Sequence, residues 1–283
     1  MRRRGWRSWG DDGGAAGVKA AEALRAAARR IDRFDAEVLL AHTLGVSRGA
    51  LLLDSGRDID APAFERLVDR RAAHEPVAYI TGVREFWSLE LRVTPDVLIP
   101  RPDSETLINA AIGAALRSGL TPARVLDLGT GSGALLLAAL SEWPGATGLG
   151  VDASAAALAV AAGNAARLGF GSRADFRLGD WGAGIGERFD LILCNPPYVE
   201  ADAVLAEDVR GFEPRSALFA GADGLDDYRR IMPQLPGLLT TGGVVVVEIG
   251  HRQAAAVLGL AVGMTGVVER DLAGRDRCVV LKA

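Results

Sequence analysis

Four consecutive residues, Asn195-Pro196-Pro197-Tyr198, have the chemical types needed to hold a planar amino group. Neither proline has a backbone N–H, and a residue that precedes a proline is held extended. The loop therefore offers the Asn195 side-chain oxygen and the proline carbonyls as acceptors, beside the flat ring of Tyr198. In-plane acceptors next to an aromatic face suit an NH2 group whose nitrogen reacts within the site. Taken alone, the four residues are equally typical of a turn that closes a strand.

The second candidate site is the glycine-rich run Asp127-Leu128-Gly129-Thr130-Gly131-Ser132-Gly133. A short apolar segment precedes it, and Asp152 closes the next apolar segment. A glycine-rich turn with an acid about 20 residues further on is typical of nucleotide binding, where the acid accepts the ribose hydroxyls. A carboxylate before the loop suits an ammonium better than a pyrophosphate, so Asp127 points to the aminoacyl end of S-adenosylmethionine. The alternative for Asp127 is a solvated acid at a strand end.

Three further residues are candidates for the same cofactor site. Asp180 and Trp181 end the third apolar segment, where the acid can meet the amino group of adenine and the ring can pack on the base. Trp181 is equally typical of a core aromatic, and Arg101, in a proline-stiffened loop, is equally typical of a solvated arginine. The residues predicted to bind the cofactor are Asp127, Gly129, Thr130, Gly131, Ser132, Gly133, Asp152, Asp180, Trp181, Asn195 and Arg101.

Together these residues indicate methyl transfer from S-adenosylmethionine to a planar NH2 group. Open α/β sheets bind ligands at the carboxyl ends of their strands, so Asn195 is expected to face the cofactor's methyl group. The acceptor nitrogen is a weak nucleophile because its lone pair is delocalised, and acceptors that bind both N–H groups favour lone-pair character on it. We predict Asn195, Pro196 and Tyr198 as catalytic residues, and the same loop with Pro197 as the substrate-binding element. Catalysis then rests on placement and electrostatic preorganisation, with no general base.

The elements that must position these residues form an α/β domain at residues 101–283. Strands are predicted at 125–128, 146–151, 175–178, 189–194, 244–249, 267–271 and 278–281. Helices between most of these strands predict a mostly parallel, Rossmann-like sheet of seven strands with helices on both faces. One continuous helix is expected over 226–239, and Asp103 or Ser104 is expected to cap a helix over 105–116.

The preceding part of the chain has a different pattern. Residues 1–17, rich in Arg and Gly, are predicted to be a disordered extension. Residues 18–75 predict a small all-α bundle, with helices near 20–30, 32–45 and 62–74 and no candidate catalytic group. Glu75-Pro76 breaks the last helix. The alternating segment 79–99 predicts a β-hairpin within a linker of residues 76–100.

Composition limits the classes of function. The chain has 283 residues, a formal net charge of −4 and a pI of about 5.5, a balance that disfavours a protein which grips the nucleic-acid backbone. Its two cysteines lie in apolar segments and are expected to be buried thiols in a reducing compartment. The three histidines have no metal-ligand spacing, and no apolar run is long enough to cross a membrane. We therefore expect a cytoplasmic protein without a metal, and we also predict a monomer.

The chain resembles the peptide chain release factor glutamine methyltransferases, the HemK/PrmC family. The resemblance covers about Val18 to the C-terminus and rests on residues 82–87, 97–105, 127–133, 195–198, 212–219, 223–226 and 271–277. The Ile-Pro-Arg-Pro loop at 99–102 and the Phe-Glu-Pro-Arg segment at 212–215 are the most diagnostic. The resemblance implies the class I S-adenosylmethionine-dependent methyltransferase fold, with S-adenosylhomocysteine as product. It implies that residues 195–198 hold the glutamine of a release factor's Gly-Gly-Gln loop for methylation at the side-chain nitrogen. It also implies that the N-terminal bundle helps to dock that protein.

Two other functions stay open on the sequence. A nucleic-acid base amino methyltransferase, acting on adenine or guanine, explains the Asn-Pro-Pro-Tyr loop equally well. It predicts a basic cleft or recognition domain, whereas this chain is acidic and has a helical bundle. A non-catalytic adenosyl-binding interaction protein requires decay of the site, and no such loss is visible. Locating a labelled methyl group among candidate acceptors separates the three functions.

Overall fold

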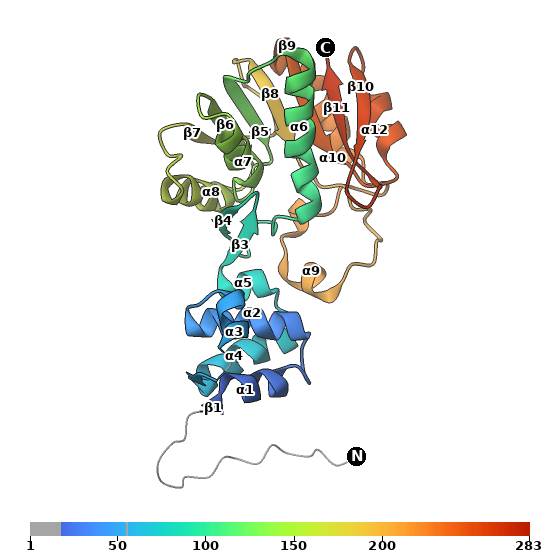
Figure 1. Cartoon of the computed structure of the whole chain (residues 1–283). Coiled ribbons are helices and arrows are strands. Elements are labelled where there is room, and N and C mark those ends of the chain that lie inside the picture. Colours follow the sequence, from blue (N-terminus) through green and yellow to red (C-terminus); the bar gives the residue numbers. More distant parts are fainter. Residues whose placement is uncertain (1–17, 55) are drawn as a thin grey trace. The chain divides into compact units, whose positions relative to one another are not determined.

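The computed structural model of the protein describes residues 18–54 and 56–283 (Figure 1). The predicted disordered extension at 1–17 lies outside the described residues. The chain divides into two compact units, one ending at Thr81 and one running from Gly82 to Ala283. This division falls within the stretch 76–100 that the sequence assigns to a linker.

The first unit is a set of short helices around one apolar cluster. Its elements are β1 (Val18–Lys19), α1 (Ala20–Ala27), α2 (Arg33–Leu44), α3 (Arg48–Leu53), β2 (Asp58–Ile59), α4 (Ala61–Ala72) and α5 (Val77–Thr81). Asp32 begins α2 by accepting from the backbone N–H groups of Phe34 and Asp35, and Gly45 ends it in the left-handed conformation. Leu39, Leu40, Phe64 and Val68 are fully buried in the cluster. The prediction of an all-α bundle omitted one feature of this unit. Strands β1 and β2, of two residues each, pair antiparallel.

The second unit contains the predicted sheet. Its strands are β5 (Arg124–Leu128), β6 (Thr147–Asp152), β7 (Ala174–Leu178), β8 (Phe189–Cys194), β9 (Leu239–Glu248), β10 (Thr265–Arg270) and β11 (Asp276–Lys282). They pair in the order β10-β11-β9-β8-β5-β6-β7, and the five from β9 to β7 are parallel (Figure 1). The prediction of a mostly parallel seven-stranded Rossmann-like sheet is confirmed. The sheet brings the carboxyl ends of five strands to one edge, with β5 between β6 and β8.

Helices cover both faces of this sheet because its strands are apolar on both sides. The helices of this unit are α6 (Glu105–Ser118), α7 (Ala134–Glu142), α8 (Ala155–Arg167), α9 (Glu207–Phe212), α10 (Asp226–Ile231), α11 (Leu235–Leu238) and α12 (Ala254–Leu260), of which α9 has no buried residue. Residues of α6, α7 and α8 share a core with Val125 and Leu193, whereas residues of α10, α11 and α12 share a second core with Leu126 and Ile192. The continuous helix expected over 226–239 is wrong. A 3-10 turn, Met232–Gln234, separates α10 from α11, because Pro233 and Pro236 lack the N–H that a helix needs.

A β-hairpin opens the second unit. Strands β3 (Val83–Phe86) and β4 (Leu89–Arg92) pair antiparallel around Trp87 and Ser88, which both have positive φ angles, 52° and 59°. Two residues of positive φ match the twist of the strands that they join. The hairpin predicted over 79–99 is therefore shorter, and its first three residues belong to α5. The irregular stretch 199–225 contains α9 and a 3-10 turn, Arg215–Ala217.

Candidate active site

A cavity of about 790 Å³ opens at the carboxyl ends of β5, β6, β7 and β8. Nine of the predicted site residues line it, namely Gly129, Thr130, Gly131, Ser132, Asp152, Asp180, Trp181, Asn195 and Pro197. Five others, all within the described part of the chain, lie outside its wall, namely Arg101, Asp127, Gly133, Pro196 and Tyr198. The fold thus gathers segments from four strand ends into one cavity.

The glycine-rich loop takes its shape from backbone conformations that other residues rarely adopt. Gly129 has a φ of 73°, and a Cβ atom there would come within 3.0 Å of the Trp181 ring. Gly131 also has a positive φ, 54°, but a Cβ there would meet nothing within 4 Å. Glycine is thus required at 129 both for conformation and for space, and at 131 for conformation.

Asp127 holds this loop from beneath. It is 1% exposed, and its Oδ2 accepts from the Thr130 hydroxyl at 2.6 Å and from the Leu136 backbone N–H at 3.3 Å. Its Oδ1 is buried and has no hydrogen-bond partner among the described residues. Burial raises the pKa of Asp127 to about 7, against the two hydrogen bonds, which lower it. The alternative of a solvated acid at a strand end is therefore wrong, and one carboxylate oxygen of Asp127 stays available to a donor.

Asp152 ends β6 and joins the loop to the next helix. Its Oδ2 accepts from the Gly131 backbone N–H and its Oδ1 from the Ser154 backbone N–H, each at 2.9 Å. Ser154 in turn caps α8 by accepting from the Ala157 N–H. Asp152 lines the cavity and is half-buried, so its carboxylate can accept from a ligand's hydroxyls while it fixes both backbone segments.

Asp180 and Trp181 follow β7 at the same edge. Asp180 forms an ion pair with Arg230, which lies in the last turn of α10. Both side chains are more than half exposed. Trp181 has a positive φ, 52°, which is rare for a residue with a side chain and places its ring against Gly129. The ring both lines the cavity and packs on the apolar cluster that includes Leu238. Trp181 is therefore both a site residue and a core aromatic.

Asn195 has a polar partner that sequence analysis missed. Its Nδ2 donates to the Ser104 Oγ at 3.3 Å, across 91 positions of sequence. Ser104 is buried and begins α6, but its side chain makes no capping hydrogen bond, so the prediction that it caps this helix is wrong. With its nitrogen engaged by Ser104, the Asn195 amide keeps its oxygen as the acceptor.

The Tyr198 ring is anchored at its hydroxyl. The O–H donates to Oε1 of Glu248 at 3.2 Å, and the half-buried ring packs on the core cluster beneath the sheet edge. Glu248, the last residue of β9, is 1% exposed. It is a second residue that sequence analysis missed, because an acid at the end of a valine-rich strand carries no motif of its own.

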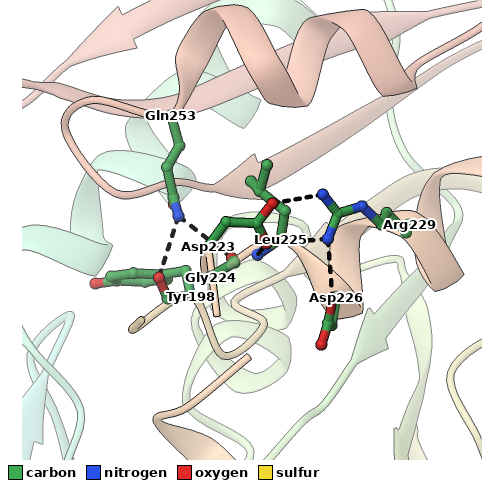
Figure 2. A network of polar contacts seen from close by, with 7 residues as sticks. All are labelled: Tyr198, Asp223, Gly224, Leu225, Asp226, Arg229 and Gln253. Carbon is green, nitrogen blue, oxygen red and sulfur yellow. Dashed lines mark hydrogen bonds and ion pairs between the residues drawn. The ribbon is translucent and has the colours of Figure 1, made fainter. Parts of the chain in front are cut away.

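A clamp also holds the Tyr198 backbone (Figure 2). The Gln253 Nε2 donates to the carbonyls of Tyr198 at 3.1 Å and Gly224 at 3.3 Å. A Cβ atom on Gly224, whose φ is 68°, would lie 2.3 Å from the Tyr198 oxygen. Next to it, Asp223 and Asp226 both pair with Arg229, as the dashed lines in Figure 2 show. The Asp-Gly-Leu-Asp motif at 223–226 thus fixes the exit of the acceptor loop.

Arg101 pairs with a carboxylate outside the cavity wall. Glu213, which is buried, accepts from the Arg101 guanidinium and from the Ile99 backbone N–H at 3.1 Å. This ion pair joins the Ile-Pro-Arg-Pro loop to the Phe-Glu-Pro-Arg segment. Arg101 is thus held in an ion pair, although its side chain remains 36% exposed, and cofactor binding by Arg101 stays a prediction.

Two protein families match two separate parts of the chain. Residues 16–82 match the family described as PrmC N-terminal domain, and residues 121–256 match the family described as Methyltransferase domain. A Release factor glutamine methyltransferase of Rhodospirillum rubrum is 44% identical over 268 residues, which cover 92% of this chain and 81% of the relative. The chain belongs to the release factor glutamine methyltransferase family. A second member, from Cereibacter sphaeroides, is 47% identical over 93% of this chain and 98% of its own length.

A solved structure shares the fold of much of the chain. The hMettl16 catalytic domain, solved in complex with the MAT2A 3'UTR hairpin 6, aligns with a TM-score of 0.53 over 75% of this chain and 81% of that one. Its sequence identity is 16%, so the likeness concerns the fold alone. Over residues 18–54 and 56–283, none of the helices has the length and apolar character for crossing a membrane.

Proposed function

We propose that the protein transfers a methyl group from S-adenosylmethionine to the side-chain amide nitrogen of the glutamine in the Gly-Gly-Gln motif of peptide chain release factors. Membership of the family supports the substrate. The observation that carries the chemistry is that one cavity is lined by the glycine-rich loop, Asp152 and Asn195. A cofactor loop and an amide-binding loop thus meet where open α/β sheets bind ligands.

The residues present fit S-adenosylmethionine. Asp127 has a buried oxygen without a partner, and a cationic donor such as the cofactor's ammonium group would complete it. Asp152 offers its carboxylate to the ribose hydroxyls, and Trp181 offers a ring face to the adenine. Bound there, the cofactor supplies an electrophilic methyl group on a sulfonium. Asp180 is proposed to bind the adenine amino group, but its ion pair with Arg230 must loosen for it to do so.

The acceptor loop acts on the glutamine amide by position and by hydrogen bonding. The Asn195 oxygen and the Pro196 carbonyl accept from the two N–H groups of the NH2, which turns the nitrogen lone pair away from them and toward the methyl donor. Hydrogen bonds that strengthen as the nitrogen rehybridises lower the barrier more than they tighten binding. Once methylated, the cationic nitrogen is acidic and loses its proton without a dedicated base.

The N-terminal unit is proposed to dock the protein substrate. The domains we propose are a docking domain at 18–75, a linker with a hairpin at 76–100 and the methyltransferase domain at 101–283. A specific protein interface buries about 800 Å² on each partner, which is far more than one glutamine side chain offers. We propose that the protein acts as a monomer in the cytoplasm, where release factors work.

The test is methylation of a purified release factor. Fragment mass spectrometry after incubation with S-adenosylmethionine should show one added methyl group on the Gly-Gly-Gln glutamine. The matched control is the same release factor with asparagine in place of that glutamine, which should stay unmodified. A methyl group on any other residue, or none on the wild-type factor, would contradict the proposal.

A further inference from the structure

Glu248 is a buried acid that the proposed chemistry does not use. Its Oε1 accepts from the Tyr198 hydroxyl at 3.2 Å, and its backbone carbonyl accepts from the Tyr228 hydroxyl at 2.8 Å. Its Oε2 is buried and has no hydrogen-bond partner among the described residues. A buried carboxyl with a hydrogen bond to only one of its oxygens lowers the stability of the fold. Its presence beneath the acceptor loop therefore suggests a function in that loop.

Ser104 links this carboxyl to Asn195. The Ser104 Oγ accepts from the Asn195 Nδ2 at 3.3 Å, and the same hydroxyl lies beside the Glu248 carboxyl, whose pKa it lowers. A serine hydroxyl has one proton to donate. If its oxygen accepts from Asn195, its proton is directed to another acceptor, and the Glu248 carboxyl is the neighbouring group of that kind.

The charge of Glu248 therefore decides the direction of the chain of hydrogen bonds. An ionised carboxyl only accepts, so Ser104 donates to it, accepts from the Asn195 nitrogen, and leaves the Asn195 oxygen for the substrate NH2. A protonated carboxyl donates to the Ser104 oxygen instead. The serine proton then turns to the Asn195 oxygen, and the amide presents its own NH2 to the substrate NH2. Two donors facing each other do not bind.

We propose that Glu248 and Ser104 are positioning residues that set the amide orientation of Asn195, and that only the ionised Glu248 gives the orientation that binds the acceptor NH2. The inference rests on the proposed function for its catalytic consequence. The orientation itself is a property of the protein without ligands, and it is measurable without turnover.

The surroundings of Glu248 place its ionisation near neutral pH. Burial is the largest influence and raises the pKa of Glu248 to about 7, while Ser104, Arg277 and Tyr198 lower it. The Arg277 guanidinium is shared with Asp103 at 3.0 Å and Asp271 at 3.1 Å, so it is not dedicated to Glu248. The ionisable groups that interact with Glu248 come from five elements or loops, namely Tyr198, Tyr228, Arg277, Cys278, Cys194 and Asp103.

The test follows the Asn195 side chain by NMR in the full chain without ligands. The sequence contains only three asparagines, Asn109, Asn164 and Asn195, so selective ¹⁵N-asparagine labelling gives three side-chain amides. Replacing Asn195 identifies its signal. We expect the Asn195 amide to shift with an apparent pKa near 7 as the pH is raised, because its nitrogen gains the Ser104 acceptor. Asn109 is exposed and Asn164 is bound to the Arg92 and Ser132 carbonyls, so both should stay constant.

Matched variants separate the linkage from other titrations. Glu248→Gln and Ser104→Ala should abolish the Asn195 titration, and Ser104→Thr, which keeps the hydroxyl, should retain it. Asp127→Asn should also retain it, although the Asp127 carboxyl titrates in the same range. Gln253→Ala removes the backbone clamp on Tyr198 and tests whether any loosening of the loop has the same effect. It should leave the titration in place.

Turnover gives the catalytic consequence. At saturating cofactor and release factor, the wild-type kcat should rise with pH through about 7, whereas Ser104→Ala should have a kcat lower by on the order of tenfold and nearly independent of pH there. Ser104→Thr should restore both. A wild-type Asn195 amide that does not titrate, or one that still titrates in Glu248→Gln, would overturn the inference even if the release factor is methylated. Absence of methylation by the wild type, with the NMR titration intact, would instead contradict the proposed function.

Discussion

Two fully buried carboxyls stand behind the two loops of the cavity, Asp127 behind the cofactor loop and Glu248 behind the acceptor loop. Each has one oxygen hydrogen-bonded and one without a partner among the described residues. Burial raises the pKa of each to about 7. The two carboxyls differ in how far along the sequence their hydrogen-bond partners lie. Asp127 binds Thr130 and Leu136, which are close by in the chain, whereas Glu248 binds Tyr198, 50 positions away.

This difference indicates two ways to build a site. The cofactor half is a local motif, in which one strand, one loop and one helix hold each other. The acceptor half is assembled from separate segments, which the neighbouring positions of β8 and β9 bring together. We therefore expect changes in the cofactor half to weaken ligand binding, and changes in the acceptor half to impair turnover.

The largest expected effect concerns the two carboxyls themselves. Each has a folded-state pKa above its unfolded value, so the folded state holds more protons between the two values. The associated stability is present below the unfolded pKa and is lost as the pH rises to about 7. In Asp127→Asn and in Glu248→Gln, the free energy of unfolding should therefore fall less between pH 4 and pH 8 than in the wild type, by about 3 kcal/mol for each variant. Urea unfolding at pH 4 and pH 8 measures this change in the free energy of unfolding. The same change in variant and wild type would show that burial does not penalise these charges.

Asn195→Ala should have the next largest effect, confined mostly to turnover. Its oxygen acts where the acceptor nitrogen changes hybridisation, and loss of one preorganised group at such a centre costs on the order of a hundredfold in rate. Steady-state kinetics at saturating cofactor and release factor measure this loss. Some loss of cofactor affinity is also expected, since Asn195 lines the shared cavity. A kcat near that of the wild type would remove Asn195 from the chemistry.

Asp152→Ala should instead weaken the cofactor. The change removes the acceptor for the ribose hydroxyls and leaves the backbone N–H groups of Gly131 and Ser154 without their carboxylate, a cost of about 1–3 kcal/mol. Calorimetry should therefore show S-adenosylmethionine binding weaker by at least about tenfold. The same affinity in variant and wild type would show that this carboxylate is not part of the cofactor site.

Much of the cofactor half could be predicted from sequence, because its contacts are short in sequence. The loop at 129–133, Asp152 and the strands around them needed only local patterns. The acceptor half could not be completed, since Ser104 and Glu248 meet the loop only when the order of the strands is known. Ser104 was predicted to cap a helix, and its side chain serves Asn195 instead. Positive φ angles at Trp87 and Trp181 also have no sequence signal, because tertiary packing imposes them.

The smallest expected effect lies outside both halves of the cavity. A chain that begins at Gly82 keeps the complete cavity wall, so it should bind S-adenosylmethionine with nearly full affinity. Its KM for the release factor should rise, because the proposed docking surface is lost, while a short peptide with the Gly-Gly-Gln motif should be methylated as by the full chain. An unchanged KM for the intact release factor would show that the N-terminal unit is not a docking element.

The most direct test of the account is where the methyl group goes when acceptors compete. The full chain is incubated with labelled S-adenosylmethionine and a mixture of release factor, ribosomal RNA and DNA, and the label is then located in each. We expect the label to enter the release factor at the Gly-Gly-Gln glutamine, with Asn195→Ala as a control that is labelled on the order of a hundredfold more slowly. Label found in adenine or guanine, with the release factor unlabelled, would contradict it and identify a nucleic-acid base methyltransferase.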